Sequence, residues 1–236
     1  MMSTLSKQLT AVLSQIEQAA NAAKRDKHEV KLLAVSKTKP VAQIKAAYAA
    51  GQRLFGENYV QEGIEKIQVL RQDADIVAPI EWHFIGPLQS NKTKPVAEHF
   101  DWVQSVDRYK IAQRLNDQRP NSLAPLNICL QVNISGEASK SGTTLSQVIE
   151  LASQVSELPH LKLRGIMAIP EATDDENILN NSFQQLHRLY LQLQQTYPDI
   201  DTLSMGMSGD MIPAIANGSS MVRVGTAIFG ARDYPA

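Results

Sequence analysis

The alternation of short apolar segments with helical patterns constrains the fold of this chain more than any other feature. Eight segments have the composition of buried strands: VKLLAVSK (30–37), RLFGEN (53–58), EWHFIGP (81–87), DWVQSVD (101–107), LNICLQVNIS (126–135), LRGIMAIP (163–170), TLSMGMS (202–208) and MVRVGTAIFG (221–230). Helical patterns separate them, and the longest of these is DDENILNNSFQQLHRLYLQLQQTY (174–197). Strands this rich in apolar residues are covered on both faces, which is typical of a parallel sheet.

An α/β chain with eight parallel strands closes most economically as a (β/α)8 TIM barrel. The alternative is an open doubly wound sheet, but the G-x-G-x-x-G sequence that would favour it is absent after the first segment. We expect a single domain over residues 1–236, because no Pro/Gly/Ser-rich linker interrupts the pattern. Residues 1–28 are expected to form an additional amphipathic helix that packs on the barrel, since apolar residues from Leu5 to Ala23 recur at steps of four and three.

Charge and hydropathy exclude several classes of protein. The formal net charge of -1 carries no basic footprint for nucleic acid. No apolar run approaches the roughly 18 residues that span a bilayer, and the segment MMSTLSKQLTAVLSQ lacks a signal-peptide core, so a cytoplasmic protein is predicted. Cys129 has no partner for an internal disulfide and is expected to pack in the core; the alternative is a reactive thiol.

Functional residues of such a barrel follow the carboxyl ends of the strands, and Lys37 ends the first segment. Alternation places Lys37 on the same strand face as Leu33 and Val35, at the mouth of an enclosed site. Burial favours the neutral amine, a nucleophile toward carbonyl groups, as Schiff-base chemistry requires. The alternative is a lysine whose stem packs at the strand end while its head lies in water. Lys39, next to Pro40, is expected to be solvated at the start of a helix.

A phosphate site is predicted near the loops after the seventh and eighth segments, where TIM barrels often bind phosphate. The loop MSGD (207–210) supplies the Ser208 hydroxyl and the backbone N–H groups near Gly209 at the start of a short helical pattern. The eighth segment supplies Gly225 and the Thr226 hydroxyl. The alternative is that both glycine-containing loops are ordinary turns.

A carbonyl-binding lysine and a phosphate site together fit pyridoxal 5'-phosphate (PLP), which carries an aldehyde and a phosphate. Arg223 lies close to the second phosphate loop and would face the pyridine nitrogen of this cofactor. A guanidinium does not give up its proton, so it would donate a hydrogen bond to an unprotonated ring and make the ring a weaker electron sink. The alternative for Arg223 is an ion pair with an acid such as Asp233.

Seven motifs follow one another from residue 32 to residue 234: LLAVSKTKP, FGENYVQE, WHFIGPLQSNK, VNISGEASKSG, GIMAIP, LSMGMSGD and MVRVGTAIFGARDY. Together they resemble the pyridoxal phosphate homeostasis protein family. The resemblance implies a PLP-dependent fold of type III, a barrel similar to the N-terminal domain of alanine racemase. It implies that Lys37 forms the internal aldimine and that Arg223 faces the pyridine nitrogen. The further cofactor-binding residues that it implies are Asn58, Ser208, Gly209, Gly225 and Thr226.

The resemblance also implies a function in PLP homeostasis: binding, buffering and delivery of PLP, with effects on amino-acid and keto-acid pools, and no metal site. The alternative is an amino-acid racemase, which needs a base on each face of the cofactor. In alanine racemase a tyrosine supplies the second base across a dimer interface that involves a second domain, for which this chain has no room after Tyr234. Tyr59, His83 and Tyr234 are the local candidates, and none has a strong claim. A carrier is therefore favoured, expected to be a monomer, with apo PLP-dependent enzymes as partners.

Overall fold

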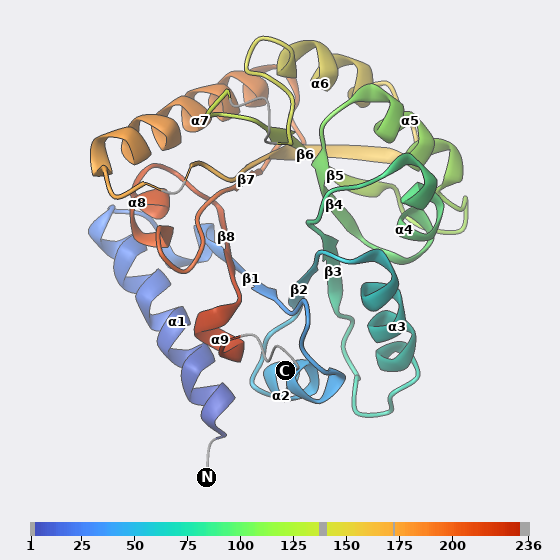
Figure 1. Ribbon diagram of the computed structural model, residues 1–236, viewed down its shortest axis with the longest axis vertical. Helices are drawn as coiled ribbons and strands as arrows, with labels where there is room; N and C mark the ends of the chain where they lie inside the picture. Colours follow the sequence, from blue (N-terminus) through green and yellow to red (C-terminus); the bar gives the residue numbers. More distant parts are fainter. Residues whose placement is uncertain (1–2, 137–140, 172, 232–236) are drawn as a thin grey trace.

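The computed structural model describes residues 3–136, 141–171 and 173–231. Within these ranges eight parallel strands form a closed barrel in sequence order, with the last strand pairing with the first (Figure 1). The strands are β1 (Lys31–Val35), β2 (Leu54–Glu57), β3 (Glu81–Phe84), β4 (Trp102–Val106), β5 (Leu126–Val132), β6 (Leu161–Ala168), β7 (Thr202–Ser204) and β8 (Met221–Val224). The predicted (β/α)8 barrel is confirmed, and closure rules out the open doubly wound sheet.

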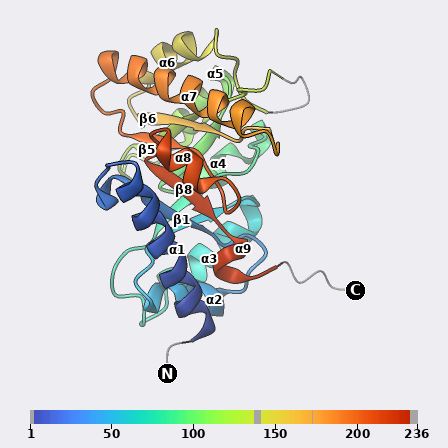
Figure 2. The ribbon, with the colours of Figure 1, turned by 90° about the vertical axis from the view of Figure 1, so that its left-hand side faces the viewer.

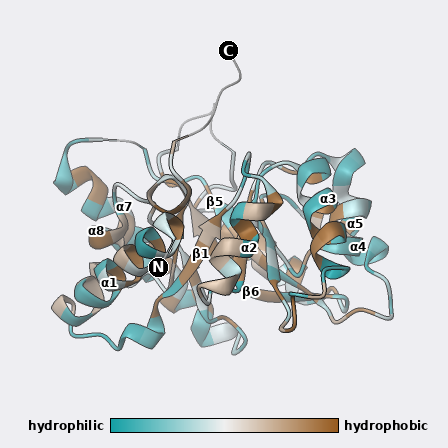
Figure 3. Cartoon of the chain, turned by 90° about the horizontal axis from the view of Figure 1, so that it is seen from below, coloured by the Kyte–Doolittle hydropathy of each residue, from teal (hydrophilic) through white to brown (hydrophobic). Residues whose placement is uncertain are grey.

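Helices surround the barrel on its outside, as Figures 1 and 2 show. They are α1 (Thr4–Ala22), α2 (Val41–Ala49), α3 (Val60–Arg71), α4 (Thr93–His99), α5 (Tyr109–Gln118), α6 (Val148–Ser156), α7 (Glu176–Thr196), α8 (Met211–Ala216) and α9 (Thr226–Phe229). Two short 3-10 turns, Lys27–Glu29 and Ser90–Lys92, precede β1 and α4. The apolar faces of the α-helices and the strands form the main core. The strands carry much of the hydrophobic colour in Figure 3.

The additional N-terminal helix α1 lies in the outer layer of the barrel, where it contacts α2, α8 and α9 (Figure 2). Its buried side chains include Leu9, Val12 and Ile16. Arg25 anchors the chain after the helix. Its Nη1 donates at 2.7 Å to the carbonyl oxygen of Ser219, which lies just before β8. The helix thus packs on the barrel on the side where the last and first strands meet.

The eighth segment, predicted as a strand-like run that contains a glycine loop, consists of a strand and a short helix. Strand β8 ends at Val224, and the apolar residues Ile228 and Phe229 belong to the short helix α9 and are buried there. A short apolar run fits a buried helix as well as a buried strand, so periodicity alone does not separate the two. The helix contacts α1 in the outer layer rather than extending the sheet.

The barrel interior contains both apolar and polar side chains. Trp102, Cys129 and Met167 form a small buried cluster of their own. Cys129 therefore packs in the core, as expected, and burial raises the pKa of its thiol well above the ordinary value, which keeps it protonated. No helix within the described ranges is long and apolar enough to cross a membrane.

Candidate functional site

One cavity at the carboxyl ends of the strands brings the sequence-predicted site residues together. It has a volume of about 320 Å³, and its polar lining consists of Lys37, Asn58, Ser208, Gly209, Arg223, Gly225 and Thr226. The rest of its wall is apolar and consists of Val35, Ile85, Ile169 and Met207. A largely preformed cavity with apolar walls and a few convergent polar groups is typical of a small-molecule site.

Lys37 lies two residues beyond β1, and its side chain is half-buried. The Ser36 N–H donates to the Gly56 carbonyl oxygen at 3.0 Å, so the chain still follows β2 after the strand has ended. Thr38 adopts a φ of 62°, in the left-handed region that costs a residue with a side chain about 1 kcal/mol or more. Its N–H donates to Glu62 Oε1 at 2.5 Å. Contacts with neighbouring segments therefore hold this turn in shape.

A buried ion-pair cluster lies directly behind the turn. The Lys66 ammonium donates to Glu57 Oε1 at 2.8 Å and to Glu62 Oε1 at 2.6 Å. It also donates to the Ser36 carbonyl oxygen at 2.7 Å, and the Ser36 hydroxyl donates to Glu57 Oε1 at 2.6 Å. Burial raises the pKa of the Glu57 carboxyl, and the Lys66 ammonium opposes that shift. The cluster fixes the residue before Lys37 and so sets the direction in which the lysine leaves the strand.

The prediction of a solvated Lys39 is wrong. Its side chain is buried, and its ammonium donates to the Ala231 carbonyl oxygen at 2.6 Å. Ala231, just after α9, thus lies beside the turn that carries Lys37. The sequence around Lys39 and Pro40 does not indicate this contact, because Lys39 and Ala231 are far apart in the sequence.

The turn after β7 places exposed backbone and hydroxyl groups at one side of the cavity. Ser208 and Gly209 are exposed at its tip. The turn is closed by the Met207 N–H, which donates to Asp210 Oδ1 at 2.5 Å. The Asp210 carboxylate is thereby engaged within its own turn, and Ser208 and Gly209 are left at the cavity wall.

The turn after β8 places a second hydroxyl on the same cavity. Thr226 is the exposed first residue of α9, directly after Gly225. A Cβ on Gly225 would lie 3.2 Å from the Val35 carbonyl oxygen. The glycine therefore permits the close approach of this turn to the end of β1. Together the two turns offer hydroxyl and backbone N–H donors of the kind that bind small anions.

Arg223 occupies the barrel interior beneath these loops. It lies on β8, which pairs with β1, and is opposite Leu33. Its side chain is buried; Nη1 donates to Ser204 Oγ at 2.8 Å and Nη2 donates to the Ala168 carbonyl oxygen at 2.9 Å. Burial lowers the pKa of its guanidinium to about 10, so it remains a cation at neutral pH. The alternative partner, Asp233, lies outside the described residues.

Asn58 follows β2 and turns its amide toward the cavity. Its Oδ1 is buried and has no hydrogen-bond partner among the described residues. Leaving such an acceptor unpaired costs about 1–3 kcal/mol. The backbone here is tightly packed, since a Cβ on Gly86 would lie 2.1 Å from the Asn58 carbonyl oxygen. The Asn58 backbone is therefore held in place at the cavity wall.

Of the residues considered as a second catalytic base, the two that the structure describes, Tyr59 and His83, do not line the cavity. Tyr59 is 53% exposed and lies at the start of α3. His83 is fully buried, with Nε2 at 2.9 Å from Glu81 Oε1 and Nδ1 at 2.9 Å from the Gln104 amide nitrogen. Tyr234 lies outside the described residues. His83 is thus a core residue with both ring nitrogens paired.

Sequence reasoning missed the residues that support Lys37. In the sequence, Glu57 is a carboxylate on an apolar strand and Lys66 is an amine on a helix, and no pattern connects the two. The helical spacing of Glu62 and Lys66 predicts an ion pair on an exposed helix face. The burial of that pair against Glu57 follows from the packing of α3 on β2, which a local pattern does not contain.

The fold is similar to that of the N-terminal domain of alanine racemase. The family described as alanine racemase, N-terminal domain, matches residues 8–233. The alanine racemase from Streptomyces coelicolor A3(2) superposes with a TM-score of 0.73 at 15% identity and covers 96% of this chain and 58% of its own. At this identity the likeness concerns the fold alone, and it confirms the expected type of barrel.

Much closer relatives match the whole length of the chain. The pyridoxal phosphate homeostasis protein of Pasteurella multocida (strain Pm70) is 59% identical over 233 residues, which are 98% of this chain and 99% of the relative. The protein of the same name from Escherichia coli (strain K12) is 54% identical over 233 residues, 99% of each chain. The structure of PipY from Synechococcus elongatus PCC7942 with PLP bound has a TM-score of 0.81 at 35% identity and covers 96% of this chain and 100% of its own. With these identities over its whole length, the chain belongs to the pyridoxal phosphate homeostasis protein family.

Proposed function

We propose that this chain binds PLP in the cavity at the carboxyl ends of its strands and serves PLP homeostasis by binding, buffering and delivering the cofactor. The observation that carries the proposal is the gathering of an amine, a guanidinium and two hydroxyl-bearing loops around one cavity of about 320 Å³. The names of its relatives and the PLP bound to PipY support the same function.

The residues present fit PLP at each of its polar groups. Lys37 is the amine for the Schiff-base linkage to the aldehyde carbon. Arg223 is the donor to the pyridine nitrogen, and the unpaired Asn58 Oδ1 is the acceptor for a cofactor hydroxyl. The phosphate ligands are the donors of the turns after β7 and β8, namely Ser208, Gly209, Gly225 and Thr226.

When bound, PLP withdraws electrons from the bonds at the α-carbon of amines that join it. This chain restrains that chemistry through Arg223. The guanidinium stays protonated and donates its hydrogen bond without releasing the proton, so the ring nitrogen remains uncharged. Such a site retains the cofactor well but activates it weakly, which suits a carrier.

The racemase alternative requires a base on the face of the cofactor opposite the lysine. Among the described residues that line the cavity, Lys37 is the one amine or imidazole placed for proton transfer at the anchor. His83 is enclosed in the barrel core, and Tyr59 projects into solvent at the start of α3. A binding protein therefore explains the lining better than a two-base racemase does.

The remaining parts of the proposal concern the setting of the protein. We propose that it works in the cytoplasm as a monomer and that its partners are apo PLP-dependent enzymes. The phosphate side of the cavity supports the delivery step, because the exposed Ser208, Gly209 and Thr226 leave that side accessible from solvent.

The test is the visible absorption spectrum of the purified protein with PLP, before and after borohydride reduction, followed by peptide mapping. We expect a yellow band that is lost on reduction, and a labelled peptide that contains Lys37. The Lys37→Ala variant is expected to lack the band, and the other lysines serve as internal controls in the map. A protein that takes up no PLP, or that carries the label on another lysine, would contradict the proposal.

Delivery is tested separately with an apo-enzyme as acceptor. The loaded protein is expected to reactivate the acceptor faster than PLP that has first dissociated into solution. A phosphatase that destroys unbound PLP distinguishes the two routes. If the phosphatase abolishes reactivation, transfer passes through solution, and the protein is a buffer rather than a donor to its partner.

A further inference from the structure

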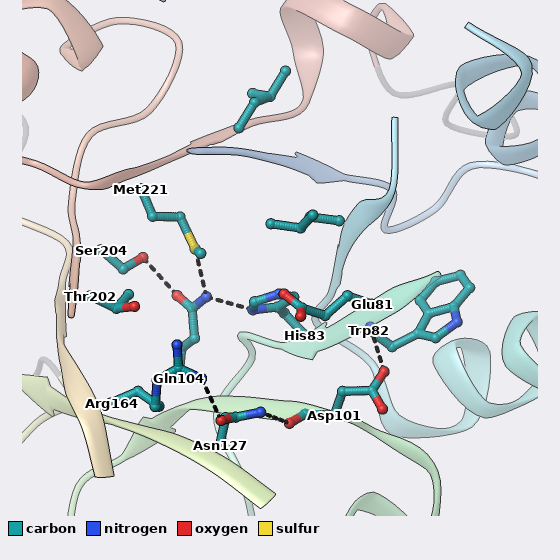
Figure 4. A network of polar contacts seen from close by, with 12 residues as sticks. Glu81, Trp82, His83, Asp101, Gln104, Asn127, Arg164, Thr202, Ser204 and Met221 are labelled. Carbon is teal, nitrogen blue, oxygen red and sulfur yellow. Dashed lines mark hydrogen bonds and ion pairs between the residues drawn. The ribbon is translucent and has the colours of Figure 1, made fainter. Parts of the chain in front are cut away.

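A chain of hydrogen bonds crosses the barrel interior from Arg223 to the opposite wall. Arg223 Nη1 donates to Ser204 Oγ at 2.8 Å, and the Ser204 hydroxyl donates to Gln104 Oε1 at 2.7 Å. The amide nitrogen of Gln104 lies 2.9 Å from His83 Nδ1, and His83 Nε2 lies 2.9 Å from Glu81 Oε1. Figure 4 shows the part of the chain from Ser204 through Gln104 and His83 to Glu81.

The hydrogen bonds of this chain all run in one direction. A guanidinium has no acceptor, so Arg223 must donate to Ser204, and the single hydroxyl proton of Ser204 then goes to Gln104. The Gln104 amide donates to His83 Nδ1, which leaves the ring proton on Nε2 to donate to the Glu81 carboxylate. Burial lowers the pKa of His83, in keeping with a neutral ring that has one proton to place. Each link therefore fixes the orientation of the next.

The central residues of this chain lie in the barrel interior. Side chains of His83, Gln104 and Ser204 are fully buried, where TIM barrels commonly place branched apolar residues. The His83 ring stacks on Trp102 with 4.9 Å between ring centroids, and Met221 Sδ lies 3.2 Å from the Gln104 amide nitrogen. These neighbours leave Gln104 little room to turn. Its carbonyl group consequently points at Ser204 with the orientation that Arg223 needs.

We propose that Gln104 is a positioning residue for the Arg223 guanidinium, acting through Ser204, with His83 fixing the orientation of its amide. This inference rests on the proposed function, since it assigns to Arg223 the contact with the PLP ring. Without the Gln104 carbonyl the Ser204 hydroxyl must seek another acceptor. Its lone pairs then turn away from Arg223 Nη1, and the guanidinium keeps only the Ala168 carbonyl oxygen as a partner. The ring contact loosens, and PLP is released faster.

The variants Gln104→Met and Ser204→Ala break the chain at its two central links. Each is expected to speed the release of PLP about tenfold, the usual effect of one lost buried hydrogen bond, and to shift the visible band of the bound cofactor. The matched control is Thr202→Val, an isosteric change on the same strand as Ser204. Thr202 Oγ1 donates to Asp201 Oδ1 at 2.8 Å and takes no part in the chain to Arg223, so this variant should behave as the wild type.

Combination with Arg223→Met separates positioning from a general loss of structure. In that background Gln104→Met is expected to have no further effect on PLP release or on the band, because the group that it positions is gone. An equal effect in both backgrounds would show that Gln104 acts through the fold, and would overturn the proposal. If Gln104→Met does not fold, the same cycle with Ser204→Ala decides.

PLP uptake by the wild-type protein distinguishes a failure of this inference from a failure of the proposed function. If the wild-type protein takes up no PLP at Lys37, the proposed function fails and this inference fails with it. If the wild type binds PLP and both chain variants release it at the wild-type rate, the proposed function stands and only the role of Gln104 is refuted.

Discussion

The position of Lys37 depends on side chains that do not line the cavity. Lys66 binds the Ser36 carbonyl oxygen, and Glu57 accepts the Ser36 hydroxyl, so the residue before the lysine is held from two directions. One of the two partners, Glu57, sits on the strand next to β1, and the other reaches it from α3. The amine of a candidate anchor thus gains its direction from an ion pair that the ligand need not touch.

Replacing Lys66 tests how much this ion pair stabilises the folded protein. The Lys66→Met variant leaves the fully buried Glu57 carboxylate without its counter-charge, and breaking a buried pair in this way costs about 3–5 kcal/mol. Urea unfolding of the apo-protein measures the change in the free energy of unfolding. The double variant Lys66→Met/Glu57→Gln removes both charges and is the control, expected to recover much of the loss. An unchanged unfolding midpoint for Lys66→Met would show that the pair carries little stability.

At the scale of elements, α1 extends the (β/α)8 pattern by one helix. Its moderate length does not by itself make it stable, since isolated helices depend on packing of an apolar face. Its apolar face contacts α2, α8 and α9, and Leu13, at the edge of that face, is exposed. The helix therefore ties the C-terminal strand–helix units to the first one, across the point where the barrel closes.

Two leucines of α1 allow this contribution to be measured with matched chemistry. Leu9 is 1% exposed and Leu13, one turn later, is 44% exposed. Leu9→Ala is expected to lower the free energy of unfolding by about 2–5 kcal/mol, because it removes buried methyl groups and leaves a cavity. Leu13→Ala is expected to cost less than about 1 kcal/mol, since most of that side chain already meets water. Equal costs in thermal or urea unfolding would contradict the burial of α1 against the barrel.

At the scale of the molecule, closure of the barrel assembles the site. Pairing of β8 with β1 brings the turn at Gly225 against Val35 and Arg223 opposite Leu33. The cavity therefore joins the first and last strands of the sheet, together with β2 and β7. A ligand held by both ends of the sheet stabilises the closed barrel and does not favour the unfolded chain.

Thermal unfolding should therefore depend on PLP. Saturation with PLP at a hundred times its dissociation constant is expected to stabilise the native state by about 2.7 kcal/mol, from mass action alone. Pyridoxal, which lacks the phosphate, is the control ligand, and it should raise the unfolding temperature less because the turns after β7 and β8 gain no partner. A melting temperature that is indifferent to PLP concentration would contradict binding to the native state.

The types of the elements, their order and most of the residues at the cavity could be predicted from the sequence. Apolar runs and helical periods are local, and a parallel sheet brings the carboxyl ends of its strands to one face, so Lys37, Asn58 and the two glycine turns could be found from pattern and resemblance. The short helix at the end of the eighth segment was missed because a short apolar run fits strand and helix equally. Lys39 was wrong because the contact that buries it joins distant parts of the chain.

The side chains that support the site from behind could not be predicted, because they meet only in the folded barrel. Burial of Lys66 against Glu57, and the hydrogen-bond chain from Arg223 through Ser204 and Gln104, join residues from different elements. No period or motif connects such residues, since their meeting depends on strand register and helix packing. The physical reason is range: hydrophobic patterning acts over a few residues along the chain, whereas buried polar groups must find partners wherever the closed barrel places them.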